Sequence, residues 1–186
     1  MKKIIIALGF VIILSFSLKA QDTSAINVIT NHRSAREFAA GQINRADLDR
    51  IIQAAIRTPS AGNRQPWLFT VVQTPALARQ IVPNITEGNI IIVISAPGDG
   101  RTNAAQILDC GLAAENIFLA AQAVGLSSRI YTGPIEGVNR NHKTALGLPR
   151  DHNAVALVRI GRALQGVDAT SAASPRNSLE SLVTYK

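Results

Sequence analysis

The chain has 186 residues, 47% of them hydrophobic, and 19 Lys and Arg against 12 Asp and Glu give a formal net charge of +7. This length is enough for one domain with a substantial apolar core. Aromatic residues make up only 4%, and the basic residues are scattered rather than gathered in long runs. These features argue against nucleic-acid binding and favour helices packed on a sheet, in an α/β or α+β fold.

Residues 1–20 have the pattern of a signal peptide. Lys2 and Lys3 precede an apolar run from Ile4 to Phe16, and Ala20 offers a small residue at the expected cleavage point. The run of about 13 residues is shorter than the ~20 that span a bilayer as a helix, which favours cleavage over an uncleaved membrane anchor. We therefore expect an exported protein, periplasmic or secreted, whose mature domain comprises residues 21–186 and has no membrane attachment.

Hydrophobic periodicity and turn residues divide the remaining chain into elements. In chain order we expect a lead-in helix or arm at 21–31, a helix at Asn44–Ile56, a loop at Pro59–Pro66, a strand at Trp67–Gln73, a helix at Pro75–Ile81, a buried strand at Asn89–Ala96, a helix at Ala104–Val124, strands at Ser128–Thr132 and Ala154–Ile160, and an extended polar tail with a small apolar anchor at Leu179, Leu182 and Val183.

The helix at Ala104–Val124 is apolar around most of its circumference. A helix of this kind must be buried, either in the core of the domain or against a second subunit. Cys110, the single cysteine of the chain, lies within it, so we expect a buried core thiol with no disulfide and no metal site around it.

Polar residues interrupt the predicted elements at three places. Arg33, Ser34 and Arg36 precede the first confident helix, and two guanidinium groups with a hydroxyl are suited to an anion; we call them the anion clamp, although a solvated basic turn has the same pattern. Ser60, Asn63 and Gln65, the carboxamide loop, lie between two prolines and could bind the imide edge of a heterocycle, or could form an ordinary connection. The third is Thr132-Gly133, together with the distant Arg176.

The order R-S-x-R-x-F, then a helix, then P-S-x-x-N-x-Q-P-W opening a strand, resembles the nitroreductase family. The resemblance continues with DCGLAAENIFLAA at Asp109–Ala121 and the LGLP at Leu146–Pro149, and it covers about Asn31 to Arg162. It implies an α+β fold with three α-β-α layers, a central mixed sheet, and an intertwined homodimer that holds FMN at the subunit interface.

The resemblance also assigns the polar residues as cofactor-binding positions. Arg33, Ser34 and Arg36 would contact the FMN phosphate and ribityl chain, and Arg176 would reach the phosphate from the tail. The carboxamide loop, Ser60, Asn63 and Gln65, would approach the flavin, with the Pro59–Asn63 turn coming from the other subunit. Thr132 and Gly133 would lie near the flavin ring, where backbone N–H groups can stabilise negative charge. Relatives commonly have a second arginine at the position of His32.

Flavin performs hydride chemistry itself, while the protein binds, orients and tunes it. We accordingly expect no catalytic acid, base or nucleophile, and we interpret His142 and His152 as surface residues. The implied activity is ping-pong reduction of nitroaromatics, quinones or similar small acceptors with NAD(P)H. Two alternatives are a non-catalytic exported flavin-binding protein of the same fold and an exported interaction domain. The sequence names neither the physiological acceptor nor the preferred nicotinamide donor.

Overall fold

The computed structural model describes residues 25–99 and 102–186, so the predicted signal peptide at 1–20 lies outside the described residues. Its elements are α1 (Ala25–Asn31), α2 (Arg45–Ile56), a 3-10 turn η1 (Ala61–Asn63), β1 (Leu68–Val72), α3 (Pro75–Ile81), β2 (Ile90–Pro97), α4 (Ala104–Ala123), β3 (Leu126–Tyr131), α5 (Ile135–Asn141), β4 (His152–Arg162), α6 (Ala169–Ala172) and α7 (Leu179–Leu182).

Helix α2 begins and ends where its sequence signals place it. The Asn44 side-chain oxygen accepts a hydrogen bond from the Asp47 N–H at 2.7 Å, which satisfies one of the free donors of the first turn. The helix ends at Ile56, and Thr58-Pro59 then directs the chain into the carboxamide loop. The cap and the proline thus fix the length of the segment that separates the two predicted binding clusters.

The sheet has four strands in the order β1-β2-β4-β3, and all three pairings are antiparallel. The expected mixed sheet is therefore wrong for the described residues. The reason lies in the position of β4. Strands β2 and β3, joined through α4, do run in the same direction, as a helical crossover requires, but β4 inserts between them and pairs antiparallel with both.

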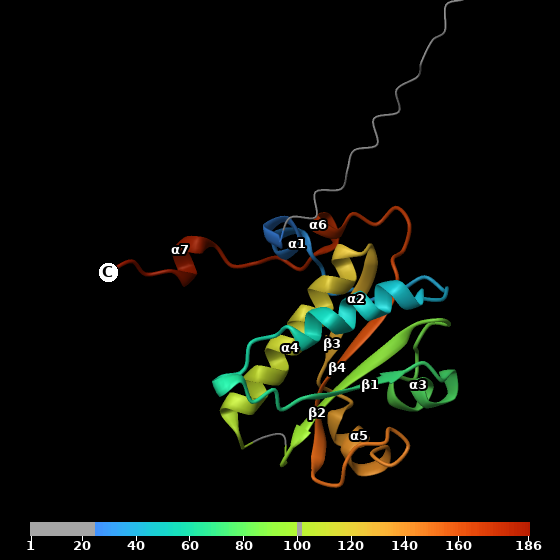
Figure 1. Ribbon diagram of the computed structural model, residues 1–186. Helices are drawn as coiled ribbons and strands as arrows, with labels where there is room; N and C mark the ends of the chain where they lie inside the picture. The colour runs from blue at the N-terminus through green and yellow to red at the C-terminus, as the bar shows by residue number, and fades with distance from the viewer. Residues whose placement is uncertain (1–24, 100–101) are drawn as a thin grey trace, which may run out of the picture.

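Helices cover both faces of the sheet, which confirms the three α-β-α layers (Figure 1). Alternate residues of β2 point to opposite faces: Ile92 and Ile94 pack with α2 and α4, whereas Ile91 and Val93 pack with α3 and the loop region after α5. All four side chains are fully buried, and each contributes about 1.5–3 kcal/mol through burial of apolar surface. The prediction of a central buried strand is confirmed.

Helix α4 is buried on one side only. Cys110, Ala113 and Ile117 are completely inaccessible, whereas Leu108 and Leu112 on the outer side are 62% and 39% exposed. By length and composition alone α4 could cross a membrane, but its packing on the sheet and on α2 accounts for its inner apolar side chains. The core alternative therefore explains one side of the helix, and the outer leucines have no cover in a single chain.

Two segments differ from expectation. Helix α5 was not predicted, because its sequence IEGVNRN contains a single buried apolar side chain, Val138. The apolar anchor expected in the tail does not form within one chain, since Leu179 and Leu182 are 61% and 67% exposed. Figure 1 shows α7 projecting away from the body of the domain, so no surface formed by residues 25–99 or 102–186 covers these two leucines.

Candidate functional site

The anion clamp is held against the sheet through its backbone. The Arg33 N–H donates to the side-chain oxygen of Gln122 at the end of α4 (3.2 Å), and the Ala35 N–H donates to the carbonyl oxygen of Ser128 in β3 (3.0 Å). Phe38, three residues further on, is buried beneath the guanidinium of Arg159, which lies 4.0 Å from its ring centroid. The small and apolar residues of the segment therefore fix its backbone to β3 and β4.

The polar side chains of the clamp remain available. Arg33 is half-buried, Ser34 and Arg36 are exposed, and within the described ranges neither guanidinium forms an ion pair with a carboxylate. His32 is occupied differently: its ring contacts the Ile29 carbonyl oxygen and packs edge-on against Phe118 at 5.2 Å. The donors that remain, two guanidinium groups and a hydroxyl, match the chemistry of a phosphate.

The carboxamide loop has an unusual backbone. Asn63 and Gln65 have φ values of 54° and 46°, and over residues 25–99 and 102–186 no other non-glycine residue has a positive φ. The loop is closed by its own polar groups, because the Ser60 hydroxyl oxygen accepts the Gln65 N–H at 2.9 Å and the Ser60 carbonyl oxygen accepts the Asn63 N–H at 2.9 Å. Non-glycine residues in this region are costly and concentrate at functional sites.

Two contacts join this loop to α4. The Asn116 amide donates to the Thr58 hydroxyl at 2.8 Å, at the base of the loop. Nearer the tip, the Ala61 N–H donates to one carboxylate oxygen of Asp109 at 3.1 Å. Asp109 is 3% exposed and was not among the predicted site residues. The signal that could have found it is a single acid on the otherwise apolar buried side of the helix.

Burial affects the neighbouring thiol as well. Desolvation, and secondarily the charge of Asp109, raises the pKa of Cys110 from 9.0 to about 11. The predicted burial of this thiol is confirmed. His142 and His152 are less exposed than expected. Both are half-buried, and the His152 Nδ1 atom is buried with no hydrogen-bond partner among the residues described.

Thr132 and Gly133 follow directly after β3 and line a cavity of about 450 Å³. Its other polar lining includes Glu136 and Asn139 of α5, two residues that the sequence analysis missed because it did not predict α5. The Thr132 carbonyl oxygen accepts the Ile135 N–H at 3.2 Å, so the turn into α5 fixes the floor of this cavity.

These clusters do not all meet in one chain. The anion clamp contacts α4 at Gln122 and the carboxamide loop contacts it at Asp109, positions separated by about 20 Å along a helix. The clamp and the cavity lie closer together, because Ser128 beside the clamp and Thr132 at the cavity are separated by about 13 Å along β3. Arg176 is exposed, and within the described residues it donates to the Ser174 carbonyl oxygen alone.

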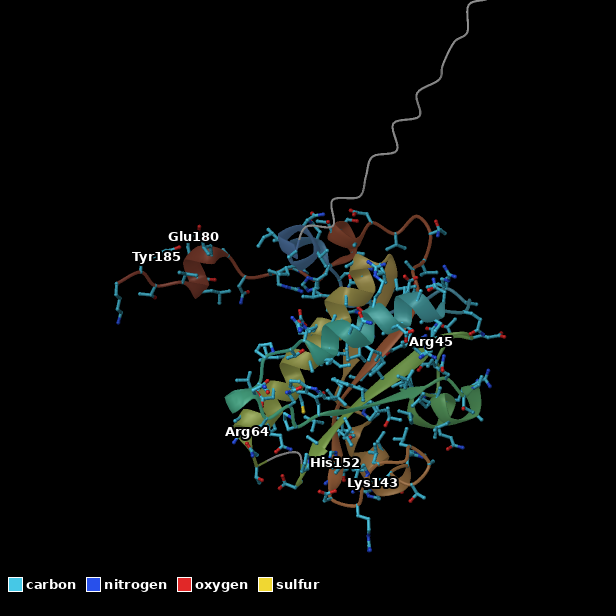
Figure 2. All side chains as sticks on the ribbon, in the orientation of Figure 1. Arg45, Arg64, Lys143, His152, Glu180 and Tyr185 are labelled. Carbon is cyan, nitrogen blue, oxygen red and sulfur yellow. The ribbon has the colours of Figure 1, made fainter. Side chains whose placement is uncertain are left out.

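Figure 2 shows where the carboxamide loop and the tail lie. Arg64 marks the loop near the start of α4, while Glu180 and Tyr185 mark the end of the tail, which leaves the domain near the other end of that helix. One chain therefore places the clamp and the Thr132 cavity along one strand, but carries its own carboxamide loop away from them. The tail first passes beside the clamp, where the Thr170 hydroxyl donates to the Asn31 side-chain oxygen at 3.3 Å, and only then projects away at α7.

Comparison with known proteins gives a consistent result. Residues 29–96 and 82–162 match the Nitroreductase family. A protein of Archaeoglobus fulgidus, named after NADH dehydrogenase and NAD(P)H nitroreductase activities, is 31% identical over 146 residues, which cover 73% of this chain and 83% of that protein. A nitroreductase with bound FMN from Desulfitobacterium hafniense superposes with a TM-score of 0.71 at 22% identity, covering 87% of this chain and 97% of the other.

An FMN-dependent nitroreductase from Clostridium difficile has a TM-score of 0.66 at 24% identity, covering 85% of this chain and 99% of that one. The two structures support the fold, and the family match spans the clamp, the carboxamide loop and the Thr132 cavity. This chain belongs to the nitroreductase family.

Proposed function

We propose that the protein is an FMN-dependent oxidoreductase that uses NAD(P)H to reduce nitroaromatics, quinones or similar small acceptors by a ping-pong mechanism. The observation that carries the proposal is the backbone of the carboxamide loop. The two non-glycine residues with positive φ in the described part of the chain, Asn63 and Gln65, are among the residues that the family resemblance directs at the flavin. Strain of this kind persists where the surroundings impose it, and it is common in binding sites.

The donor set at the clamp fits the FMN phosphate. Arg33 and Arg36 bring two positive charges that no carboxylate of the described chain neutralises, and Ser34 adds a hydroxyl. Their backbone is already fixed to β3 by the Ala35 hydrogen bond. Binding therefore requires little ordering of the main chain, which favours affinity.

A homodimer accounts for the separation of the clusters. The carboxamide loop and the clamp of one chain contact α4 at positions about 20 Å apart along the helix, and a partner chain could supply the loop to the other active site. The exposed outer leucines of α4, Leu108 and Leu112, and the projecting tail with Leu179 would then gain apolar cover. In such a dimer Arg176 would approach the phosphate.

The roles of the residues follow from this arrangement. Bound FMN supplies hydride transfer, and the protein orients it. Arg33 and Arg36 would hold the phosphate, Asn63 and Gln65 would fix the polar edge of the ring with their carboxamides, and the main chain at Thr132-Gly133 would stabilise negative charge on it. No side chain of this site has to exchange a proton.

The apparent signal peptide at residues 1–20 supports an exported location, periplasmic or secreted, and this raises the alternative of a non-catalytic flavin-binding protein. FMN and nicotinamide cofactors are abundant inside cells, so an exported member must acquire its flavin and its electrons elsewhere. The structure of the site is compatible with both functions, because binding and orientation are common to them.

Anaerobic reduction tests the proposal. The FMN-loaded protein is mixed with NADH and, separately, with NADPH, and the flavin absorbance is followed. Bleaching by either donor, followed by recovery of the absorbance on addition of a quinone or nitroaromatic, is the expected result. A flavin that binds but is bleached by neither donor would contradict the enzyme and support the flavin-binding alternative.

A further inference from the structure

The buried carboxylate of Asp109 is a polar group that the proposed function leaves unexplained. Asp109 lies on the inner side of α4 beside Cys110 and Ala113, both completely inaccessible. One of its oxygens accepts the Ala61 N–H at 3.1 Å, and the other is buried without a hydrogen-bond partner in the described part of the chain. A carboxylate in such surroundings is costly, because it gives up water for a single hydrogen bond.

The donor of that hydrogen bond explains the position of Asp109. Ala61 is the first residue of the turn η1, and the first N–H groups of any helical turn lack partners within it. Ser60 occupies the capping position but makes no side-chain bond to the turn. Its hydroxyl oxygen instead accepts the Gln65 N–H at the far end of the loop. Asp109 therefore caps the turn from a different helix, 48 positions along the chain.

The hydrogen bonds of Ser60 and Asp109 hold the loop backbone in an unfavourable conformation. Gly62, Asn63 and Gln65 all have positive φ, and the two non-glycine residues cost about 1 kcal/mol or more each in that conformation. Ser60 closes the loop on itself. Among the residues that the structure describes, only Asp109 and the Asn116 to Thr58 contact connect the loop by side-chain hydrogen bonds to α4. The second of these lies at the base of the loop, ahead of the strained residues.

We propose that Asp109 is the positioning residue of the carboxamide loop: its carboxylate holds the Ala61 N–H so that Ser60, Asn63 and Gln65 keep the shape in which they meet the flavin. The inference rests on the proposed function for its last clause only. The tethering of the loop is a property of the protein with or without FMN, and it can be measured separately.

Two substitutions separate the acceptor from the charge. Asp109→Asn keeps a side-chain oxygen for the Ala61 N–H, whereas Asp109→Ala removes it. Loss of one such hydrogen bond from a charged acceptor should open the loop about 10-fold or more often, while Asp109→Asn should stay within about 3-fold of the unsubstituted protein. Rescue by the asparagine is the mark of a positioning role.

Trypsin reports loop opening directly. Arg64 is exposed in the loop (Figure 2), and the rate of cleavage after it can be followed by mass spectrometry on the FMN-free protein. Asp109→Ala should raise this rate about 10-fold. On the FMN-loaded protein, the same variant should weaken flavin binding and change the visible circular dichroism of the bound ring, and Asp109→Asn should restore both.

Asn116→Ala is the matched control. It removes the contact with Thr58 at the loop base and leaves the Ala61 contact in place. We expect it to lower thermal stability. The rate of cleavage after Arg64 should stay within about 3-fold of the starting value, and the visible circular dichroism of the bound flavin should stay close to that of the unsubstituted protein. If Asn116→Ala moves both readouts as far as Asp109→Ala does, Asp109 has only a general structural role and the proposal is overturned.

Hydrogen exchange in the unsubstituted protein keeps the test decisive should Asp109→Ala fail to fold. The Ala61 amide should exchange slowly, because it is bonded to a buried carboxylate, and faster exchange there than at the Asn63 amide, which is bonded within the loop, would contradict the tether. A protein that binds no FMN but shows the expected cleavage and exchange would refute the proposed function while leaving the tether standing.

Discussion

The anion clamp and the carboxamide loop are fixed by opposite means. In the clamp the backbone is bonded to the sheet, and the side chains of Arg33 and Arg36 are left without carboxylate partners. In the loop the Ser60 side chain accepts a hydrogen bond from the loop's own backbone, which is strained at Asn63 and Gln65. The comparison indicates that the clamp acts through charge and the loop through shape, so the two should respond differently to substitution and to salt.

The largest expected effect concerns the clamp. Arg33→Ala and Arg36→Ala should each weaken FMN binding by about 1.5 to 3 kcal/mol, the range of charge-assisted contacts. Equilibrium titration of the FMN-free protein measures this, and added salt should narrow the difference by screening. Arg45→Ala, which removes an exposed arginine already paired with Asp49, is the matched control. Full affinity in both clamp variants would place the phosphate elsewhere.

The next effect tests whether water is excluded from the region around Asp109, the residue that holds the carboxamide loop. The pKa of Cys110, beside Asp109, is raised from 9.0 to about 11, so above pH 9 the thiol ionises in the unfolded chain but stays protonated in the folded one. The folded state then binds more protons, and its stability falls as pH rises from about 9 to 11, by at most about 2 to 3 kcal/mol.

Denaturant unfolding between pH 8 and 11 measures this loss of stability. Cys110→Ala is the reference, since it lacks the titrating group although its cavity lowers stability at every pH. The free energy of unfolding of the unsubstituted protein, relative to that of Cys110→Ala, should be constant below about pH 8.5 and should fall between about pH 9 and 11. If the free energies of unfolding of the two proteins change equally with pH, water reaches the thiol, and hence the region of Asp109.

The smallest effect concerns the shape of the loop. Gln65→Gly relieves the positive φ but adds conformational freedom to the unfolded chain, so the two terms, each about 0.5 to 1 kcal/mol, should nearly cancel in thermal stability. Turnover and FMN affinity should nevertheless fall, because the carboxamide is lost. A variant with unchanged turnover would show that Gln65 contributes strain without function.

The sequence predicted those elements whose signals are local. Asn44 and the proline at 59 delimit α2, alternating isoleucines and valines identify β2, and the bounds of α3 agree with its prediction. Helix α5 lacked such a pattern, since only Val138 is buried in it. Short polar helices of this kind are determined by the surface they pack on rather than by their own periodicity.

Long-range arrangement was the part that could not be predicted. The insertion of β4 between β2 and β3 depends on pairings far apart in sequence, and it turned an expected mixed sheet into an antiparallel one. The tether from Asp109 to Ala61 joins residues of two elements with no local pattern in common. For the tail, Leu179 and Leu182 are exposed, so these apolar residues find no partner surface among the described residues of their own chain.

The central claim is that the clamp and the loop together hold a flavin, and the absorbance spectrum of the purified protein tests it most directly. We predict a yellow protein with a flavin band and about one FMN per subunit, either as isolated or after addition of FMN. A colourless preparation that also fails to take up added FMN would contradict the account.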